Sequence, residues 1–308
     1  MLRLAFVFPG QGSQYVGMGK ELAQSFPAAR QVYEAADEIC GYELSSLCFE
    51  GPQEKLDQTQ FAQPAILVTS LACLAVAREH GLSSELVSGL SLGEYTALVA
   101  AGVLTMEQAL PLVIKRAELM QQAVPLGKGA MAAIIGLDSQ AVENACREVD
   151  GIVTLANYNC PGQYVISGEK EAVEKAAELL KQQGAKTMLL AISVPSHSPL
   201  MRECSQVLAQ EIAGVEFREP RLSGIVSNVN AAENSLGDIP RLLAEQLYSP
   251  VRWEQSIVYM LPKIDYFVEI GPGSSLSGLI KKIERNRVLG NVENNRSLQK
   301  LMEKVKSL

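Results

Sequence analysis

The residues Gly89-Leu90-Ser91-Leu92-Gly93 form the only Gly-x-Ser-x-Gly sequence in this 308-residue chain. A strand-like apolar run precedes them at residues 86–87, and a helix-like run follows at residues 94–101. Glycines two positions either side of a serine allow a sharp turn from strand to helix that exposes the hydroxyl. The N-terminus of the helix then points at whatever the hydroxyl attacks. Ser91 is therefore a candidate nucleophile for acyl transfer.

A serine nucleophile needs a base, and the chain offers only two histidines. His80 stands at the end of an expected helix, where a solvated, helix-capping role is the more common one. His197 lies in a loop braced by Pro195 and Pro199. Together with a serine exposed at a sharp strand-to-helix turn, His197 is the better candidate for the general base.

A glycine-rich loop, Pro9-Gly10-Gln11-Gly12, follows the first apolar strand. In a parallel sheet this loop and Ser91 share one edge, so the N–H groups of the loop are placed to help build an oxyanion hole. A nucleotide-phosphate loop is excluded. Tyr15 stands where the dinucleotide pattern needs glycine, and Met18 stands where the Walker pattern needs lysine.

The composition limits the class of protein. With 47% hydrophobic and 20% charged residues, the chain can bury the core of one or two domains. A net charge of −7 argues against bulk binding to nucleic acid or an anionic membrane. Six scattered cysteines without a Cys-x-x-Cys pair indicate reduced thiols in a cytoplasmic protein and no metal site. The N-terminus lacks signal-peptide architecture, and the apolar stretch at residues 65–77 is too short to span a bilayer.

Strands and helices alternate along the chain, which predicts a mostly parallel sheet with its active site at the strand ends. Helices are expected at residues 63–79, with Pro64 at the start, and after a Thr105/Gln108 capping box up to about residue 124. Pro111 should kink the second of these helices. Residues 127–195 follow the order β-α-β-β-α-β of a ferredoxin-like module. We therefore expect an α/β fold with an inserted subdomain.

Five segments together resemble the malonyl-CoA:acyl carrier protein transacylases of bacterial fatty-acid synthesis, over nearly the whole chain. In order, these segments are Phe8-Pro9-Gly10-Gln11-Gly12-Ser13-Gln14, Gly89-Leu90-Ser91-Leu92-Gly93-Glu94-Tyr95, Val194-Pro195-Ser196-His197, Glu245-Gln246-Leu247-Tyr248-Ser249-Pro250-Val251 and Glu269-Ile270-Gly271-Pro272-Gly273.

The resemblance implies a hydrolase-like domain at residues 1–126 and 196–308, interrupted by a ferredoxin-like subdomain at residues 127–195. It implies Ser91 as nucleophile and His197 as base. The main-chain carbonyl of Gln246 would be the partner of the histidine, and the backbone N–H groups of Gln11 and Leu92 would form the oxyanion hole.

Arg116 read alone would be, with Lys115, one of two charges on a solvated helix face. The resemblance instead implies that Arg116 binds the carboxylate of the substrate, and a planar guanidinium suits a carboxylate through two parallel hydrogen bonds. The chain departs from the family pattern at Leu90, where most members carry histidine. Leucine neither titrates nor donates a hydrogen bond, so whatever that histidine contributes is absent here.

The resemblance implies ping-pong transfer of malonyl from malonyl-CoA to the phosphopantetheine thiol of acyl carrier protein in fatty-acid biosynthesis, by a monomer without a cofactor. Three alternatives stay open: a discrete acyltransferase that loads a polyketide synthase, a serine esterase or thioesterase, and a non-catalytic docking protein. Because acyl carrier protein is acidic, its docking needs a local basic patch. The candidate residues are Lys181, Lys186, Lys281, Lys282 and Arg285.

Overall fold

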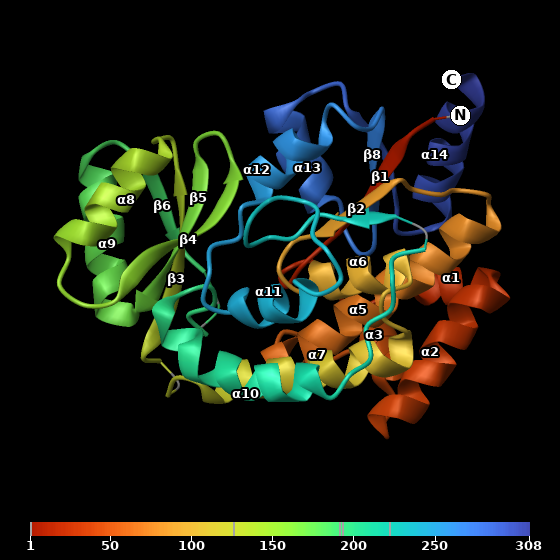
Figure 1. The fold of residues 1–308 in the computed structure, drawn as a ribbon, viewed down its shortest axis with the longest axis horizontal. Helices are drawn as coiled ribbons and strands as arrows, with labels where there is room; N and C mark the ends of the chain where they lie inside the picture. Colours follow the sequence, from red (N-terminus) through yellow and green to blue (C-terminus); the bar gives the residue numbers. More distant parts are fainter. Residues whose placement is uncertain (1, 126, 191, 193, 222) are drawn as a thin grey trace.

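The computed structural model describes residues 2–125, 127–190, 192, 194–221 and 223–308. Two separate sheets organise the chain, with the smaller one forming the green lobe of Figure 1. The expected α/β fold class is confirmed. The division into residues 1–126 with 196–308 and residues 127–195 stays a prediction. Its boundary at Leu126, and the parts of the expected strand and loop at Ala191 and Ser193, lie outside the described residues.

The larger sheet is parallel throughout, with strand order β7-β2-β1-β8-β9. Residues of β1 alternate between two cores: Leu4, Phe6 and Phe8 pack into the larger one, and Ala5 and Val7 into the smaller one. Both faces are therefore covered, which explains why β1 is an unbroken apolar run. The strands are β1 (Leu4–Phe8), β2 (Leu86–Gly89), β7 (Gly224–Ile225), β8 (Tyr266–Ile270) and β9 (Val288–Val292).

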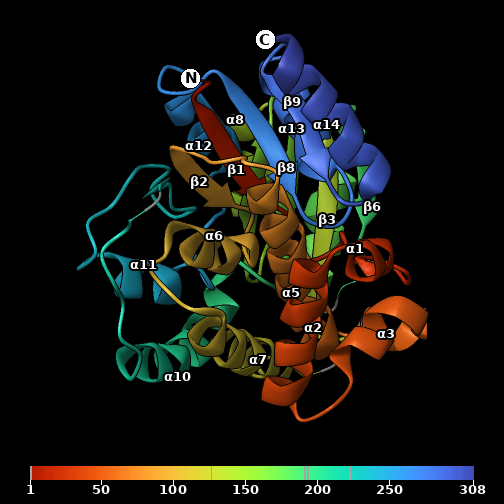
Figure 2. The same ribbon diagram turned by 90° about the vertical axis from the view of Figure 1, so that its right-hand side faces the viewer.

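Helices cover both faces of this sheet, and Figure 2 shows α2, α5, α6 and α7 below strands β2, β1 and β8. Helices α12 and α13 supply apolar side chains to the smaller core on the other face. The helices of this part are α1 (Lys20–Ser25), α2 (Pro27–Cys40), α3 (Leu44–Glu50), α4 (Gln53–Leu56), α5 (Thr59–Glu79), α6 (Gly93–Ala101), α7 (Met106–Gln122), α10 (Arg202–Ala213), α11 (Ile239–Glu245), α12 (Trp253–Met260), α13 (Ser275–Ile283) and α14 (Asn295–Ser307), with a short 3₁₀ turn at Pro199–Met201.

The smaller sheet is antiparallel, with strand order β4-β5-β3-β6 and a core of its own. Its elements follow one another as β-α-β-β-α-β, the order read from the sequence. They are β3 (Gly129–Ile135), α8 (Ser139–Glu148), β4 (Val153–Cys160), β5 (Gln163–Glu169), α9 (Lys170–Gln182) and β6 (Lys186–Leu189).

Helix α5 differs from its expectation. It begins at Thr59, so Pro64 lies inside the helix rather than at its start. A proline there removes one backbone hydrogen bond, which the burial of most of the helix outweighs. By length and composition α5 is long enough to cross a membrane, but 83% of its most apolar window is buried inside the protein. Burial of this kind is typical of a core helix.

Candidate active site

The turn at Ser91 joins β2 to α6, and the strained residue is the serine itself, with φ of 52°. The flanking glycines serve close packing instead. A Cβ on Gly89 would lie 1.9 Å from the carbonyl carbon of Gly93, and one on Gly93 would lie 2.1 Å from the oxygen of Phe8. The strand end, the turn and the helix start therefore fit together only without side chains at both glycines.

Asn228, just after β7, braces this turn. Its Oδ1 accepts a hydrogen bond of 2.6 Å from the Ser91 N–H, and its Nδ2 donates one of 2.7 Å to the Gly89 carbonyl. The side chain is fully buried. The sequence reading missed Asn228, because nothing nearby in the chain marks one asparagine of a long loop as different.

His197 and Ser91 meet in the folded chain, although 106 positions separate them. Nε2 of His197 lies 2.8 Å from Oγ of Ser91, and Nδ1 lies 2.8 Å from the main-chain oxygen of Gln246. Since a carbonyl only accepts, Nδ1 carries the proton and Nε2 is free to receive the proton of the hydroxyl.

Burial, helped by the charge of Arg116, lowers the pKa of His197 to about 4, although the hydrogen bond to Gln246 opposes the shift. The imidazole is 3% exposed and is neutral at pH 7. A neutral imidazole beside a serine hydroxyl has the arrangement of a general base.

Arg116 reaches the same hydroxyl from α7. Its Nη2 donates to Oγ of Ser91 and to Oε1 of Gln246, each at 3.0 Å, and its Nη1 donates to Oε1 of Gln63 at 2.6 Å. The residue is only 1% exposed, so the reading as a solvated charge does not describe it. Pro111, inside α7, does not prevent this contact. A buried guanidinium next to a nucleophile can hold a carboxylate carried by the acyl group.

Gln11 and Leu92 lie on the two connections that leave neighbouring strands β1 and β2. Leu92 is the last residue before α6, and the side chain of Gln11 donates to Oγ1 of Thr59 at 3.0 Å. Within the described part of the chain, neither backbone N–H donates to a protein acceptor. Both are thus available to an oxyanion, and that role stays a prediction.

Leu90 is half-buried against the smaller core. A Cβ on Gly10 would lie 2.4 Å from the Leu90 oxygen and 3.2 Å from its Cδ2 atom. Residue 90 therefore touches the glycine loop, and Gly10 is needed for the loop to approach the turn. At this position the leucine side chain contributes packing and no hydrogen bond, while its backbone N–H donates to the Phe8 oxygen at 3.0 Å.

Comparison with known proteins is consistent with this geometry. The family model described as acyl transferase domain matches residues 5–304. The malonyl CoA-acyl carrier protein transacylase of Bacillus subtilis is 47% identical over 291 residues, with 92% of each chain covered. Its counterpart in Escherichia coli K12 is 45% identical over 289 residues, covering 92% of this chain and 93% of the other.

Comparison with solved structures also finds malonyl transacylases. The malonyl CoA-acyl carrier protein transacylase of Clostridium perfringens has a TM-score of 0.96 at 38% identity, covering 99% of this chain and 98% of that one. A malonyl-transacylase in complex with its type II polyketide synthase acyl-carrier protein has a TM-score of 0.95 at 44% identity, covering 98% of this chain and 99% of that one.

Proposed function

This chain belongs to the acyl transferase domain family, and on that premise we propose that it transfers malonyl from malonyl-CoA to acyl carrier protein. The protein is an acyltransferase, and its relatives are malonyl transacylases. The observation that carries the malonyl assignment is Arg116, whose guanidinium lies 3.0 Å from the hydroxyl of the candidate nucleophile. A cation buried there favours an acyl group that ends in a carboxylate.

In the first half of the reaction, Oγ of Ser91 attacks the thioester carbonyl while Nε2 of His197 takes the hydroxyl proton. The N–H groups of Gln11 and Leu92 hold the negative charge on the carbonyl oxygen. When the carbon–sulfur bond breaks, coenzyme A leaves as its thiol with the proton from the imidazole. Malonyl remains as an ester on Ser91.

In the second half, the phosphopantetheine thiol of acyl carrier protein gives its proton to His197 and attacks the ester. The carbon–oxygen bond breaks, and the proton returns to Ser91. Arg116 holds the malonyl carboxylate through both halves. These steps use side chains and backbone amides alone, so we propose that the enzyme works without a cofactor. We also propose that it is a cytoplasmic monomer.

Mass spectrometry after mixing with malonyl-CoA tests this function. We expect a malonyl adduct on the peptide that contains Ser91 and none in Ser91→Ala. The proposal fails when wild type gives no adduct, or when the adduct persists in the serine variant. An esterase would instead release coenzyme A in the absence of carrier protein, at a rate that matches the rate of transfer measured with carrier protein.

Polyketide loading is the second candidate, because one of the most similar solved structures is a complex with a polyketide synthase carrier protein. The residues around Ser91 serve either pathway equally. Transfer to purified carrier proteins of both kinds separates them, and we expect the larger kcat/KM for the fatty-acid carrier.

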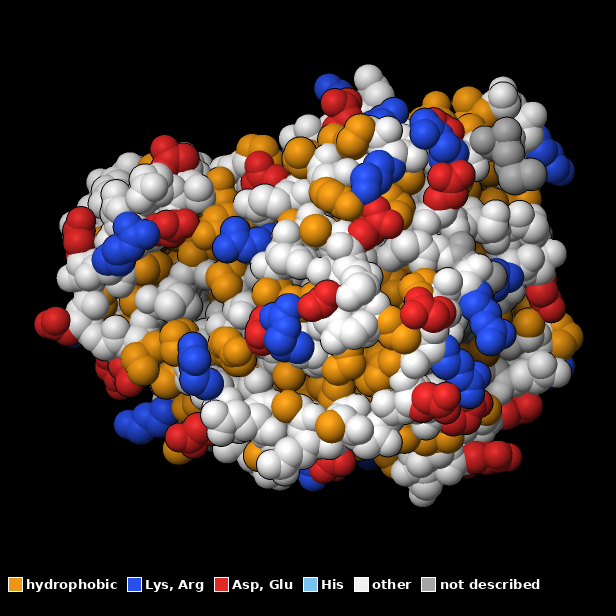
Figure 3. All heavy atoms as spheres, in the orientation of Figure 1, with side chains coloured by type: hydrophobic (Ala, Val, Ile, Leu, Met, Phe, Trp, Pro, Cys, Tyr) orange, Lys and Arg blue, Asp and Glu red, His pale blue; other side chains and the backbone are white. Residues whose placement is uncertain are grey.

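The docking surface for an acidic carrier must be local, since Figure 3 shows acidic and basic side chains interspersed over one face of the molecule. We propose the basic groove, a hollow of about 880 Å³ between α13, β9 and α14 that includes neither Ser91 nor His197. Its cations are Lys281, Arg296, Lys300 and Lys304, and none of them has an ion-pair partner within 4.0 Å in the described part of the chain.

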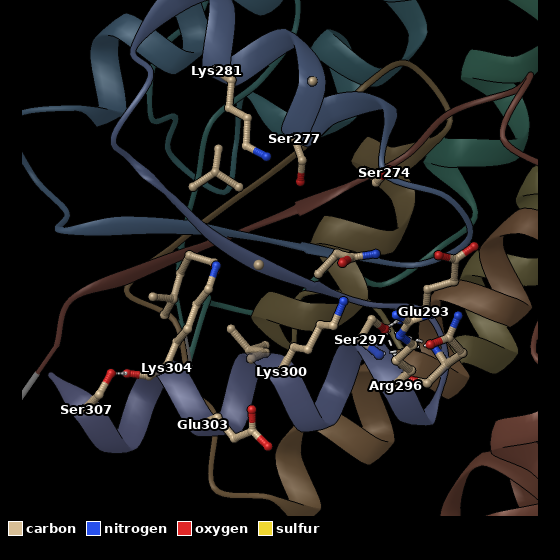
Figure 4. Close-up of a pocket in the computed structure, with 17 residues that line it drawn as sticks. Ser274, Ser277, Lys281, Glu293, Arg296, Ser297, Lys300, Glu303, Lys304 and Ser307 are labelled. Carbon is tan, nitrogen blue, oxygen red and sulfur yellow. Dashed lines mark hydrogen bonds between the residues drawn. The ribbon is translucent and has the colours of Figure 1, made fainter.

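Two features favour this groove. In Figure 4, Lys281 points into the hollow from α13, and Lys300 and Lys304 point into it from α14. At one end lies Glu293, which accepts hydrogen bonds from Tyr15 at 2.7 Å and from the Gly273 N–H at 2.9 Å. Tyr15 follows closely on the loop of Gln11, so that end of the groove adjoins the predicted oxyanion loop.

Of the five basic residues that the sequence suggested for docking, one lines the groove and the other four do not. Lys281 lines the groove, whereas Lys282 donates to Gln163 of the smaller sheet at 2.8 Å and Lys181 lies 3.8 Å from Glu178. Lys186 begins β6, and Arg285 is exposed just after α13.

Double charge reversal, Lys281→Glu with Lys300→Glu, tests the groove. We expect the KM for carrier protein to rise at least about tenfold, because each reversal replaces an attraction of about 0.3–1 kcal/mol by a similar repulsion. The KM for malonyl-CoA should not change. Lys306→Glu, on α14 but outside the groove, is the matched control. Equal effects on both substrates would remove the groove from consideration.

A further inference from the structure

Glu94 is a buried carboxylate directly beside the catalytic residues. It lies in the first turn of α6, three positions after Ser91, and is 3% exposed. Its Oε2 accepts hydrogen bonds from Nε2 of Gln246 at 2.7 Å and from the backbone N–H of Asn228 at 3.1 Å. Burial raises the pKa of this carboxyl, while the hydrogen bonds from Asn228 and Gln246 and the charge of Arg116 oppose that shift, and a negative charge is favoured near a helix N-terminus. Glu94 thus ties two distant loops to the helix that follows the nucleophile.

Gln246 joins this carboxylate to the rest of the site. Its main-chain oxygen accepts from His197 at 2.8 Å, and its side-chain Oε1 accepts from Arg116 at 3.0 Å. Its Nε2 donates to Glu94 and, at 3.1 Å, to the main-chain oxygen of Ser91. One residue therefore contacts the base, the carboxylate-binding arginine and the nucleophile.

The orientation of this amide matters, because a glutamine side chain can present either its oxygen or its NH₂ group in a given direction. A guanidinium only donates, and an ionised carboxylate only accepts. With Glu94 on one side, the NH₂ of Gln246 faces the carboxylate and the oxygen faces Arg116. Without Glu94, the amide keeps Arg116 and the main-chain oxygen of Ser91 as partners but loses its shortest hydrogen bond, the one of 2.7 Å to the carboxylate.

We propose that Glu94 is a positioning residue that fixes the Gln246 amide, and through it the placement of Arg116 and the preference for carboxylated acyl groups. The inference rests on the proposed malonyl transfer. Asn228 takes part in the same arrangement, since its N–H donates to Glu94 while its side chain braces the turn at Ser91.

A double-mutant cycle tests the proposal. Glu94→Gln keeps the size of the side chain and removes its charge, and Gln246→Met keeps the approximate length and removes the amide. We expect Glu94→Gln alone to lower kcat/KM for malonyl-CoA about tenfold, the effect of one hydrogen bond to a charged group, and to lower the malonyl-to-acetyl ratio. In the Gln246→Met background, the same change should cost less than about twofold, because residues that act through one another are not additive.

Glu269 supplies the matched control. It is a second buried carboxylate, 1% exposed, and accepts from the N–H groups of Leu276 at 3.1 Å and Ser277 at 2.7 Å. Glu269→Gln should lower the thermal stability, leave the malonyl-to-acetyl ratio unchanged, and combine with Gln246→Met as independent factors. If Glu94→Gln does not fold, Glu94→Asp replaces it in the cycle, since the shorter carboxylate cannot span the distance to Gln246.

The positioning role is overturned if Glu94→Gln transfers malonyl like wild type, if its cost multiplies with that of Gln246→Met, or if malonyl and acetyl transfer fall equally. The wild-type arm separates this failure from failure of the proposed function. Wild type that transfers no malonyl contradicts the function, and the cycle is then run on the acyl-CoA that wild type accepts. Malonyl transfer by wild type with uncoupled variants contradicts the role of Glu94 alone.

Discussion

Arg116→Ala should convert a malonyl-selective site into one that tolerates acetyl groups. The guanidinium already donates to Gln63, Gln246 and Ser91. A carboxylate that binds through both oxygens takes two of the five N–H groups of an arginine, in place of some of these acceptors. Acetyl has no carboxylate and makes neither of these two bonds.

The size of the effect follows from those two bonds. A hydrogen bond to a charged group contributes about 1.5–3 kcal/mol, so losing two costs about 3–6 kcal/mol. Since about 1.4 kcal/mol corresponds to a factor of ten, kcat/KM for malonyl-CoA should fall about 10²- to 10⁴-fold. Acetyl transfer should fall about tenfold at most, through loosening of Gln63 and Gln246.

The assay measures transfer from malonyl-CoA and acetyl-CoA to one carrier protein for wild type and Arg116→Ala. Lys115→Ala is the matched control, because the neighbouring Lys115 is partly exposed on the same helix and lies 3.9 Å from Glu211. We expect it to change either rate by less than about twofold. An equal loss of malonyl and acetyl transfer in Arg116→Ala would refute the selective role of the guanidinium.

Three further outcomes follow from burial and close packing. With the pKa of His197 lowered to about 4, acylation should lose rate only as the pH falls toward 4, and a midpoint near 6.5 in stopped-flow measurements would contradict this. Burial raises the pKa of Glu269 to about 7, so its folded carboxyl keeps a proton that the unfolded chain releases above about pH 4.5. Stability should therefore fall by about 3 kcal/mol between pH 4.5 and 7, and urea unfolding should show a smaller fall in Glu269→Gln. Gly93→Ala should abolish the Ser91 adduct, because its Cβ would lie 2.1 Å from the Phe8 oxygen, while Gly237→Ala, in open space, should keep it.

Local sequence was enough to predict the turn around Ser91, because strand, glycines, serine and helix are consecutive. His197 was identifiable by scarcity, as one of two histidines. Gln63, Glu94 and Asn228 were not identified as part of the site. Their partners lie far away in the chain, and glutamine, glutamate and asparagine are common on surfaces, so only the fold reveals that these three are buried.

The fold was predictable to a similar extent. The alternation of strands and helices gave the α/β class and the β-α-β-β-α-β order, because both depend on patterns within short windows. Strand β9 was missed, since Gly290 and Asn291 disfavour strands and only pairing with β8 holds them there. Helices α3 and α4 are too short to show a helical period. Helix α5 starts earlier than expected, because its burial tolerates an internal proline.

The two residues predicted to carry out catalysis share an unusual backbone. Among the described residues, only Ser91, His197 and Ala231 have positive φ without being glycine, and the first two have φ of 52° and 60°. A left-handed conformation costs a residue with a side chain about 1–2 kcal/mol. A glycine at position 91 would relieve that cost and remove the hydroxyl, giving a more stable protein without catalytic activity. Selection for thermal stability alone would therefore favour loss of the serine at position 91. Selection for catalytic turnover is what retains a strained serine there.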